Sequence, residues 1–284
     1  MYGSLVITEN PVTAWEQFHE MFHTQDLLDI PRVVKRDMGG YHSMTFEMIV
    51  EEAIARQYLS QGVGRNVELF YEDGRTAWEG MISAVELDTG TARIRTTIDN
   101  MGNYVWVRHQ PVGGGAAVRS NIAENAASQA RYGYKHWVIA GGELDAGVAD
   151  QMAEKWLRGN YWPQPVLDQI SFDATSMQAK IKFNCIGYYH TLNWCVYNQT
   201  ALSGEADADS VISAILADAH VGQFIASTDI RTNVTQVTQE FDADRRAKDI
   251  LESIAALGDV SYLPWVVGVG PGREFYYRPA ARPY

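Results

Sequence analysis

The sequence lacks long apolar runs, has few cysteines and carries little positive charge. No run of about 18 apolar residues occurs in its 284 residues, so no membrane-spanning helix is expected. The first residues contain no basic segment and only a short apolar run, which predicts no secretory signal at that end. The two cysteines, Cys185 and Cys195, fit a reducing compartment, and we expect two buried thiols rather than a disulfide.

The charge balance is acidic. Lys and Arg number 23 against 35 Asp and Glu, which gives a formal net charge of -12. Affinity for nucleic acid comes mainly from cationic side chains that displace counterions, so sequence-specific binding of nucleic acid is not expected. An acidic surface instead suits a protein past which DNA slides without sticking. Hydrophobic residues at 46% and charged residues at 20% are typical of a globular protein.

The stretch at residues 39–108 predicts the centre of the fold. Asp73-Gly74 lies between two runs rich in apolar and aromatic residues, and Asp-Gly supplies the positive φ angles of a tight hairpin. A second turn at residues 88–90 leads into a third strand. Apolar and charged residues alternate along these strands, so we expect an antiparallel meander with one buried face and one wet face.

The whole pattern predicts an α+β fold, mainly antiparallel, with two small β-barrel-like domains and helical insertions. Residues 1–112 are assigned to a first β-barrel-like domain with a covering helix. Residues 113–180 are assigned to a helix-strand-helix-strand insertion, and 181–284 to a second barrel-like half with two helices. Helices are expected at residues 12–28, 51–62, 121–132, 145–158, 207–219 and 243–257, with Asn121, Asp207 and Asp242 as caps. Strands are expected at 5–8, 31–50, 104–108, 135–140, 166–172, 179–189, 192–197, 262–269 and 274–278.

Apolar faces are expected on three of these elements. The helix at 51–62 has Ala53, Ile54, Tyr58 and Leu59 on one face, and the helix at 145–158 is expected to bury Val148, Met152, Trp156 and Leu157. The strand at 179–189 has Ile181, Phe183 and Cys185 on one face.

Two glycine-rich stretches are candidate anion sites. Three consecutive glycines within residues 110–115 suggest a phosphate loop, but no Gly-Lys-Ser/Thr follows, so a linker or loop tip is favoured and marks the first boundary. The run at residues 268–272 resembles an anion-binding nest. No helix follows it, so we expect the turn of a hairpin.

The sequence His19-Glu20-Met21-Phe22-His23 matches the H-E-x-x-H pattern of zinc peptidases, in which two histidines one helical turn apart bind zinc and the glutamate is the base. No third ligand follows in the next turns. Apolar residues beside the histidines fit an ordinary amphipathic helix. A zinc metallopeptidase is therefore kept as an alternative function and not as the favoured one.

Other chemistry has little support in the sequence. Cys185, His190 and Cys195 match no usual zinc spacing and lack a fourth ligand. No Gly-x-Ser-x-Gly occurs, and neither cysteine lies in a nucleophile signature. We therefore expect no catalytic residue, no metal and no cofactor. The 8 Trp, 15 Tyr and 9 Phe could line a groove of a carbohydrate-binding module, a further alternative, although core and protein contacts use such residues more often.

A family resemblance rests on several short motifs. They are Gly39-Gly40-Tyr41 with Thr45-Phe46, Gly64-Arg-Asn-Val-Glu-Leu, Trp78-Glu-Gly80, Asn103-Tyr-Val-Trp-Val-Arg108 and Ala126-Ala-Ser-Gln-Ala-Arg-Tyr-Gly133. Together these segments resemble the N-terminal part of tail-tip or baseplate hub proteins of tailed bacteriophages. The similarity covers residues 33–165 well and the remainder loosely.

The resemblance implies a structural virion protein with no catalysis of its own. Such hubs are homotrimers that set two barrels per copy into a pseudo-sixfold ring and join a hexameric tail tube to a threefold tip, with DNA passing the lumen. The implied partners are copies of itself, the tail tube or distal tail protein, the tape-measure protein, and tip or fibre proteins. The implied location is the virion tail tip, after assembly in the host cytoplasm. Related hubs often carry a further C-terminal wall-cleaving or fibre-like module, and we expect none here.

The wet face of the meander is the expected contact surface. Its charged residues are Glu68, Glu72, Arg93 and Arg95. They are chosen by geometry alone, because each faces away from the buried side of its strand.

Overall fold

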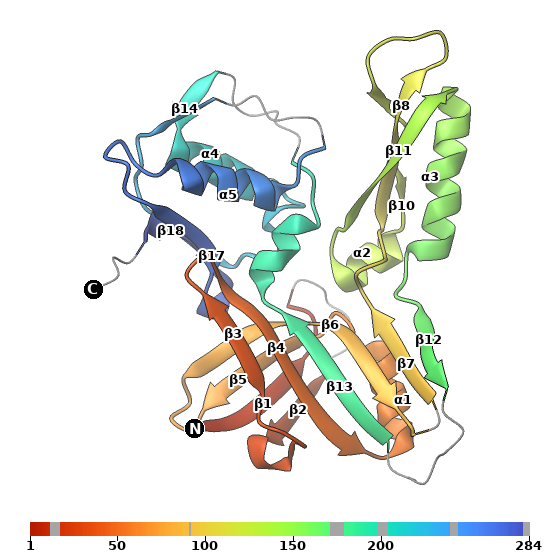
Figure 1. The fold of residues 1–284 in the computed structure, drawn as a ribbon, viewed down its shortest axis with the longest axis vertical. Coiled ribbons are helices and arrows are strands. Elements are labelled where there is room, and N and C mark those ends of the chain that lie inside the picture. Colours follow the sequence, from red (N-terminus) through yellow and green to blue (C-terminus); the bar gives the residue numbers. More distant parts are fainter. Residues whose placement is uncertain (12–17, 91, 171–178, 198–203, 239–243, 281–284) are drawn as a thin grey trace.

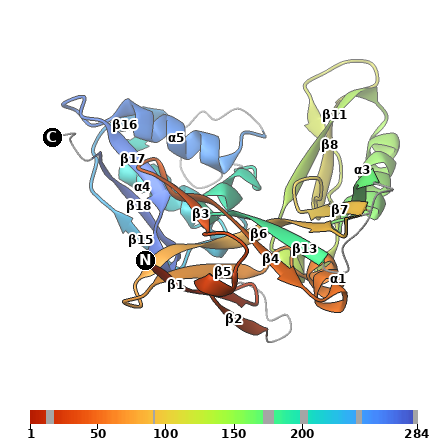
Figure 2. The same ribbon diagram turned by 60° about the horizontal axis from the view of Figure 1, so that its bottom comes forward.

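The structure is a computed structural model that describes residues 1–11, 18–90, 92–170, 179–197, 204–238 and 244–280. It confirms the α+β class with mainly antiparallel sheets. The described strands form one sheet of 12 strands, a second of 4 and a third of 2. Figures 1 and 2 show a sheet body from which two lobes rise, an arm around β8 and β11 and a C-terminal unit around α4 and α5.

The sheet body contains the expected meander. β5 (Asn66–Tyr71), β6 (Thr76–Asp88) and β7 (Ala92–Thr97) pair antiparallel in sequence order. β1 (Tyr2–Thr8) extends the sheet beside β5. β13 (Ala179–Ile186) lies between β4 (Gly39–Val50) and β6, so strands from different predicted segments share one sheet.

The predicted helix at residues 12–28 is wrong where the structure describes it. Its first residues, 12–17, lie outside the described part, but β2 (His19–His23) is a strand that pairs antiparallel with β1. The 3-10 helix η1 (Thr24–Asp26) follows. Pairing with an available sheet edge outweighs the weak helical periodicity of this short stretch. After η1 the chain lies beside β4 (Gly39–Val50), and the Leu28 amide donates to the Glu47 carbonyl of that strand at 2.9 Å.

A helix covers one end of the sheet body, as expected. It is α1 (Glu52–Gln61), which buries Ala55 and Tyr58 but leaves Ile54 41% exposed, so the predicted apolar face was partly wrong. The Tyr58 ring meets Phe183 of β13 edge-on at 5.1 Å. β3 (Arg32–Arg36) pairs with β4, and β12 (Pro165–Ile170) pairs with β7, as strands predicted from the sequence.

The arm is a small sheet covered on one face by a helix. β8 (Tyr104–Pro111) pairs parallel with β11 (His136–Leu144) and antiparallel with β9 (Val118–Arg119) and β10 (Ala123–Glu124). The glycine-rich stretch after β8 is therefore a loop tip within one sheet, since it joins β8 to its own neighbour β9. The helices of the arm are α2 (Ala126–Tyr132) and α3 (Ala146–Asn160).

Two details of the arm correct the sequence prediction. The cap of α2 is Asn125, whose side chain accepts from the Ser128 amide, whereas Asn121 bonds Asp150 instead. α3 buries Ala149, Ala153 and Leu157 against β8. Of the predicted face, Leu157 is buried and Trp156 is partly buried, whereas Val148 and Met152 are exposed because the helix presents its alanines to the sheet.

The C-terminal unit comprises described residues 187–280. The predicted strand at 192–197 is wrong, because residues there form the 3-10 helix η2 (Tyr188–Asn193) followed by a single bridge between Val196 and Arg246. Asp242, the predicted cap of the last helix, lies outside the described residues, and α5 (Ala247–Leu257) begins after Arg246. The other elements are β14 (Glu205–Asp207), α4 (Ala208–Leu216), η3 (Gly222–Phe224), β15 (Ser227–Ile230), β16 (Gln236–Thr238), β17 (Trp265–Val269), η4 (Pro271–Arg273) and β18 (Glu274–Pro279).

Candidate functional site

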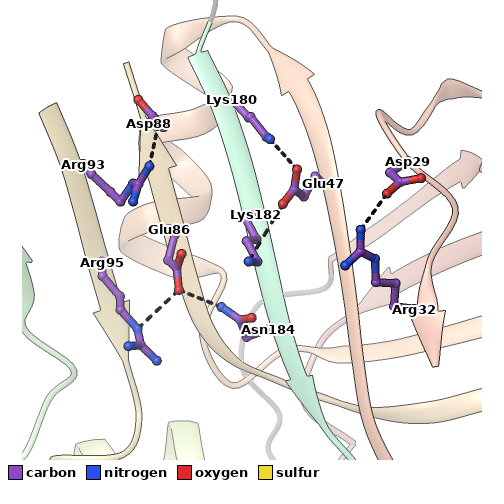
Figure 3. A network of polar contacts seen from close by, with 10 residues as sticks. All are labelled: Asp29, Arg32, Glu47, Glu86, Asp88, Arg93, Arg95, Lys180, Lys182 and Asn184. Carbon is purple, nitrogen blue, oxygen red and sulfur yellow. Dashed lines mark hydrogen bonds and ion pairs between the residues drawn. The ribbon is translucent and has the colours of Figure 1, made fainter. Parts of the chain in front are cut away.

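The best-defined candidate surface is an ordered set of charges on the outer face of the sheet body (Figure 3). We call it the charged face and define it by residues of four neighbouring strands. One row runs across β4, β13, β6 and β7, where Lys182 faces both Glu47 and Glu86, and Glu86 faces Arg95. A second row places Lys180 opposite Asp88 and Asp88 opposite Arg93. Charges of opposite sign therefore alternate from strand to strand.

The charges of this face bond one another. Lys180 Nζ lies 2.5 Å from Glu47 Oε2, and Arg93 lies 3.2 Å from Asp88. Arg95 Nε is 3.6 Å from Glu86 Oε1, and the same oxygen accepts a hydrogen bond from the side-chain amide of Asn184 at 2.9 Å. The hydrogen bond from the Gly90 backbone amide lowers the pKa of Asp88, and Arg93 lowers it further. These partly exposed pairs orient each other but contribute little stability individually.

The opposite side of the same strands fixes the face in place. Ile181, Phe183 and Cys185 alternate with the charged residues of β13 and are buried, as the sequence predicted. The Phe183 ring stacks on Phe46 at 4.5 Å. The face encloses a shallow hollow of about 150 Å³, which is lined by its own charged side chains. It is therefore suited to contact with another macromolecule and not to enclosing a small substrate.

The structure brings together only part of the predicted contact surface. Arg93 and Arg95 lie on the charged face. Glu72 is exposed near the Asp73-Gly74 turn, and Glu68 points into a different hollow. The sequence did not indicate Glu47, Lys180 or Lys182 as members, because they come from strands whose place beside the meander depends on long-range pairing.

The second hollow, of about 440 Å³, is lined by a carboxylate from each of β5 and β6, by Glu9 after β1 and by Arg273. Glu68 of β5 and Glu79 of β6 are direct cross-strand partners, so their side chains are neighbours. Glu79 is 7% exposed and accepts from the Gly272 amide at 2.7 Å. Burial raises the pKa of Glu79, and the negative charge of the neighbouring Glu68 raises it further. The glycine run at 268–272 is the hairpin turn that was predicted, and one of its amides already binds a carboxylate of the chain itself.

The H-E-x-x-H residues do not have the arrangement of a helical zinc site. In β2 the alternating pattern leaves His19 and His23 exposed and Glu20 on the other face. Residues four apart in a strand are separated by roughly 13 Å, whereas one helical turn spans 5.4 Å. Glu20 is partly buried, and this burial raises its pKa.

The Cys185, His190 and Cys195 triplet is likewise dispersed. Both cysteines are free and buried, which confirms the predicted thiols, and burial raises the pKa of each. The Cys195 Sγ donates to the His220 carbonyl at 3.1 Å, while the His190 ring contacts His42 at 4.5 Å. Across the described residues no three His, Cys, Asp or Glu side chains are grouped so as to hold a metal ion.

An exposed apolar loop lies at the end of α5. Asp259 Oδ1 accepts from the amides of Ser261 and Leu263, which fixes the loop, and Tyr262 stands 92% exposed at its tip. The Asn233 side chain donates to the Gly258 carbonyl, which brings a second segment alongside. The exposed apolar residues of this loop and its neighbour are Val234, Leu257, Val260, Tyr262 and Leu263.

In the part of the chain that the structure describes, exposed aromatic side chains do not gather into a platform of the kind that binds sugars. Trp78 and Trp106 are fully buried, and Trp137, Trp156 and Trp162 are partly buried. Among the described residues, Tyr262 is the one Phe, Tyr or Trp side chain that is largely exposed. The described helices also include none that is long and apolar enough to cross a membrane.

Comparison with known proteins shows a weak similarity to a solved structure. No family model and no curated protein matches the chain. Among solved structures, the chain is similar to the tail protein from Neisseria meningitidis MC58, with a TM-score of 0.42 and 10% sequence identity. The match covers 97% of this chain and 50% of that one, so the chain spans about half the length of this neighbour.

Proposed function

We propose that the chain is a structural virion protein of a phage tail, with no catalysis of its own. In finer detail, we propose a hub or adaptor at the distal end of the tail that joins the hexameric tube to the threefold tip. The proposal rests on the motif resemblance and on the surfaces described above. The similarity to the Neisseria tail protein does not support the proposal, because a TM-score of 0.42 is too low to carry an argument about function.

The observation that supports a contact role most directly is the charged face. Its charges are paired in register above the stacked rings of Phe46 and Phe183, so neighbouring side chains orient one another. A face with alternating charge recognises a partner through complementary charge, which gives specificity more than affinity. The exposed Tyr262 loop adds an apolar contact of the kind found at the centre of protein interfaces.

The resemblance supplies the proposed partners. These are other copies of the chain in a trimer, the tail tube or distal tail protein, the tape-measure protein, and tip or fibre proteins. The net charge of -12 suits a ring whose lumen DNA must pass, since like charge opposes sticking.

The decisive measurement is the mass of the assembly in solution and the copy number in the particle. We expect three copies. The variants Lys182→Glu and Arg95→Glu reverse charge on the charged face and are expected to weaken tail incorporation. Arg158→Glu is the matched control, because Arg158 lies on α3 with its side chain 81% exposed.

The outcomes separate the proposals. Normal incorporation of both face variants would show that the charged face is not part of the interface. The proposed tail role would not be affected by that result. A stable monomer that carries stoichiometric zinc, lost in His19→Ala, would overturn the structural role itself and restore the peptidase alternative.

A further inference from the structure

Two histidines from different lobes meet where the arm touches the C-terminal unit. His136 is the first residue of β11 in the arm, and His220 lies between α4 and η3 in the C-terminal unit. His136 Nε2 is 3.0 Å from His220 Nδ1. His136 is 4% exposed, whereas His220 is only partly buried. We call the two residues the histidine pair.

The hydrogen bonds around the pair determine where its protons lie. The Val196 amide donates to His136 Nδ1 at 3.0 Å, so Nδ1 must carry a lone pair. The proton of neutral His136 is then on Nε2, which donates to His220 Nδ1. His220 Nδ1 is therefore an acceptor, and the proton of neutral His220 is on Nε2.

Each neutral ring therefore has one nitrogen lone pair, and each of these lone pairs already accepts a hydrogen bond that crosses the junction. A proton taken up by His220 must go to Nδ1, which removes the acceptor for His136. A proton taken up by His136 must go to Nδ1, which removes the acceptor for the Val196 amide. Any protonation of the pair therefore breaks one hydrogen bond between the arm and the C-terminal unit.

The surroundings favour the neutral pair. The Arg246 guanidinium donates to the carbonyls of His136 and Trp194 at 3.1 and 2.9 Å, so a cation already occupies the junction. The Tyr104 ring stacks on His136 at 4.8 Å, and Tyr134 stacks on His220 at 3.7 Å. The titratable and charged groups that face the pair are Tyr104, Arg119, Glu124, Tyr134, Cys195, Asp218 and Arg246.

We propose that the histidine pair is an acid-sensitive contact, so that protonation loosens the junction between the arm and the C-terminal unit. Other hydrogen bonds also cross this junction, among them the two between the Gln223 side chain and the Tyr134 backbone. The arm would stay attached to the sheet body through the chain before β8 and after α3 (Figure 1). This inference is independent of the proposed tail function, because it depends only on the contacts of the junction.

Electrostatics set the direction of the effect. Burial lowers the pKa of His136 to about 3, and burial also lowers the pKa of His220, against the opposing influence of Asp218 and Glu124. A histidine released to solvent has the ordinary pKa of about 6.5. The open state therefore binds more protons, and opening is favoured as the pH falls below about 6.5. His220, the more exposed ring with two carboxylates nearby, takes up the first proton.

Amide exchange of the intact protein tests the proposal. The Val196 amide reports the junction, and the Ser120 amide, bonded to the Val107 carbonyl within the arm, is the internal control. Corrected for intrinsic exchange, the protection of Val196 relative to Ser120 should fall by up to about tenfold per pH unit between pH 6 and 5. Histidine side-chain nitrogen NMR at pH 7.5 should show the Nε2–H tautomer for both rings.

Two variants separate titration from packing. In His220→Asn the side-chain oxygen can replace Nδ1 as acceptor without titrating, so Val196 should keep more protection at pH 5. In His220→Phe the ring remains on Tyr134 but the acceptor is lost, so Val196 should be poorly protected already at pH 7.5. His23→Gln, at an exposed histidine far from the junction, is the control.

Either of two results overturns the inference. One is an Nδ1–H tautomer at His136. The other is a ratio of Val196 to Ser120 protection that does not change from pH 7 to pH 5. Both are measured on the wild-type chain, so they stand even if a variant fails to fold.

Discussion

Two glycines show at the residue scale how two different physical demands select the same residue. Gly74, in the hairpin turn, has a φ of +81°, and a Cβ there would meet nothing within 4 Å. Gly187 has an ordinary φ of -69°, but a Cβ there would lie 1.7 Å from the Tyr41 carbonyl oxygen. The first position needs glycine for its backbone angle and the second for its close approach.

Alanine substitution should distinguish these demands. We expect Gly74→Ala to lower the free energy of unfolding by about 1 kcal/mol, the cost of a left-handed residue. We expect Gly187→Ala to lower it by about 3 kcal/mol or more, because the backbone must move to admit the methyl group. Urea unfolding checks both. Equal effects would contradict this assignment.

Lys135 provides a pH-dependent prediction at the same scale. It is 6% exposed, and its ammonium donates to the carbonyls of Ile98 and Asp99. Burial lowers its pKa to about 8 from the ordinary 10.5. Between these values the unfolded chain binds more protons, so the contribution of Lys135 to stability rises with pH.

The measurement is the difference in unfolding free energy between the wild type and Lys135→Met. From pH 8 to 9.5 this difference should shift by about 1 to 2 kcal/mol in favour of the wild type. The buried thiols of Cys185 and Cys195 act in the opposite direction over this range, but they are common to both proteins and cancel. A difference that stays constant with pH would show that Lys135 keeps its ordinary pKa.

At the scale of elements, α3 shows how the register of a helix face is decided. The sequence supports an apolar stripe through Val148 and Met152, yet the helix turns Ala149 and Ala153 toward β8. Alanine lets the helix axis approach the sheet closely, and larger side chains at the margin of the contact remain partly exposed. Apolar periodicity alone does not fix this choice, since both stripes have helical spacing.

This packing predicts an asymmetry between neighbouring positions. Ala153→Leu should destabilise the arm by about 1–3 kcal/mol, because the added carbons have no space against β8. Met152→Ala should change stability by less than about 0.5 kcal/mol, since the Met152 side chain is partly solvated. Thermal unfolding followed by circular dichroism would test the pair, and the reverse order would restore the face predicted from sequence.

At the scale of the whole molecule, one aspartate makes three of the hydrogen bonds that join the arm to the C-terminal unit. Asp244 accepts from Arg108 at 3.0 Å, from Arg119 at 3.1 Å and from the Trp106 indole at 3.2 Å. All three donors belong to β8 and β9, whereas Asp244 precedes α5. The tie therefore joins elements more than 100 residues apart, as the separations of 136, 125 and 138 positions show.

Removing the charge should loosen this contact. For Asp244→Asn we expect a loss of about 1.5–3 kcal/mol, the range for hydrogen bonds to charged groups, confined to the junction. Amide exchange in β8 and β11 should increase while exchange in β13 stays unchanged. A uniform increase over the whole chain would instead show that the lobes unfold as one cooperative unit.

Local sequence determined the elements whose signals are complete within a few residues. The Asp73-Gly74 hairpin, the alternation of β13, the helix α1 and the hairpin of β17 and β18 all have their turn or cap residues and their periodicity in one short stretch. The acidic charge and the two buried thiols also follow from composition and local pattern.

Only the tertiary structure decided which stretches meet. Residues 19–23 form a strand because β1 offers an edge, and Lys182 joins Glu47, Glu86 and Arg95 because β13 enters between β4 and β6. The meeting of His136 with His220 likewise depends on packing between distant elements. The physical reason is that turn chemistry and periodicity act over a few residues, whereas edge pairing and burial act between segments whose separation along the chain carries no local signal.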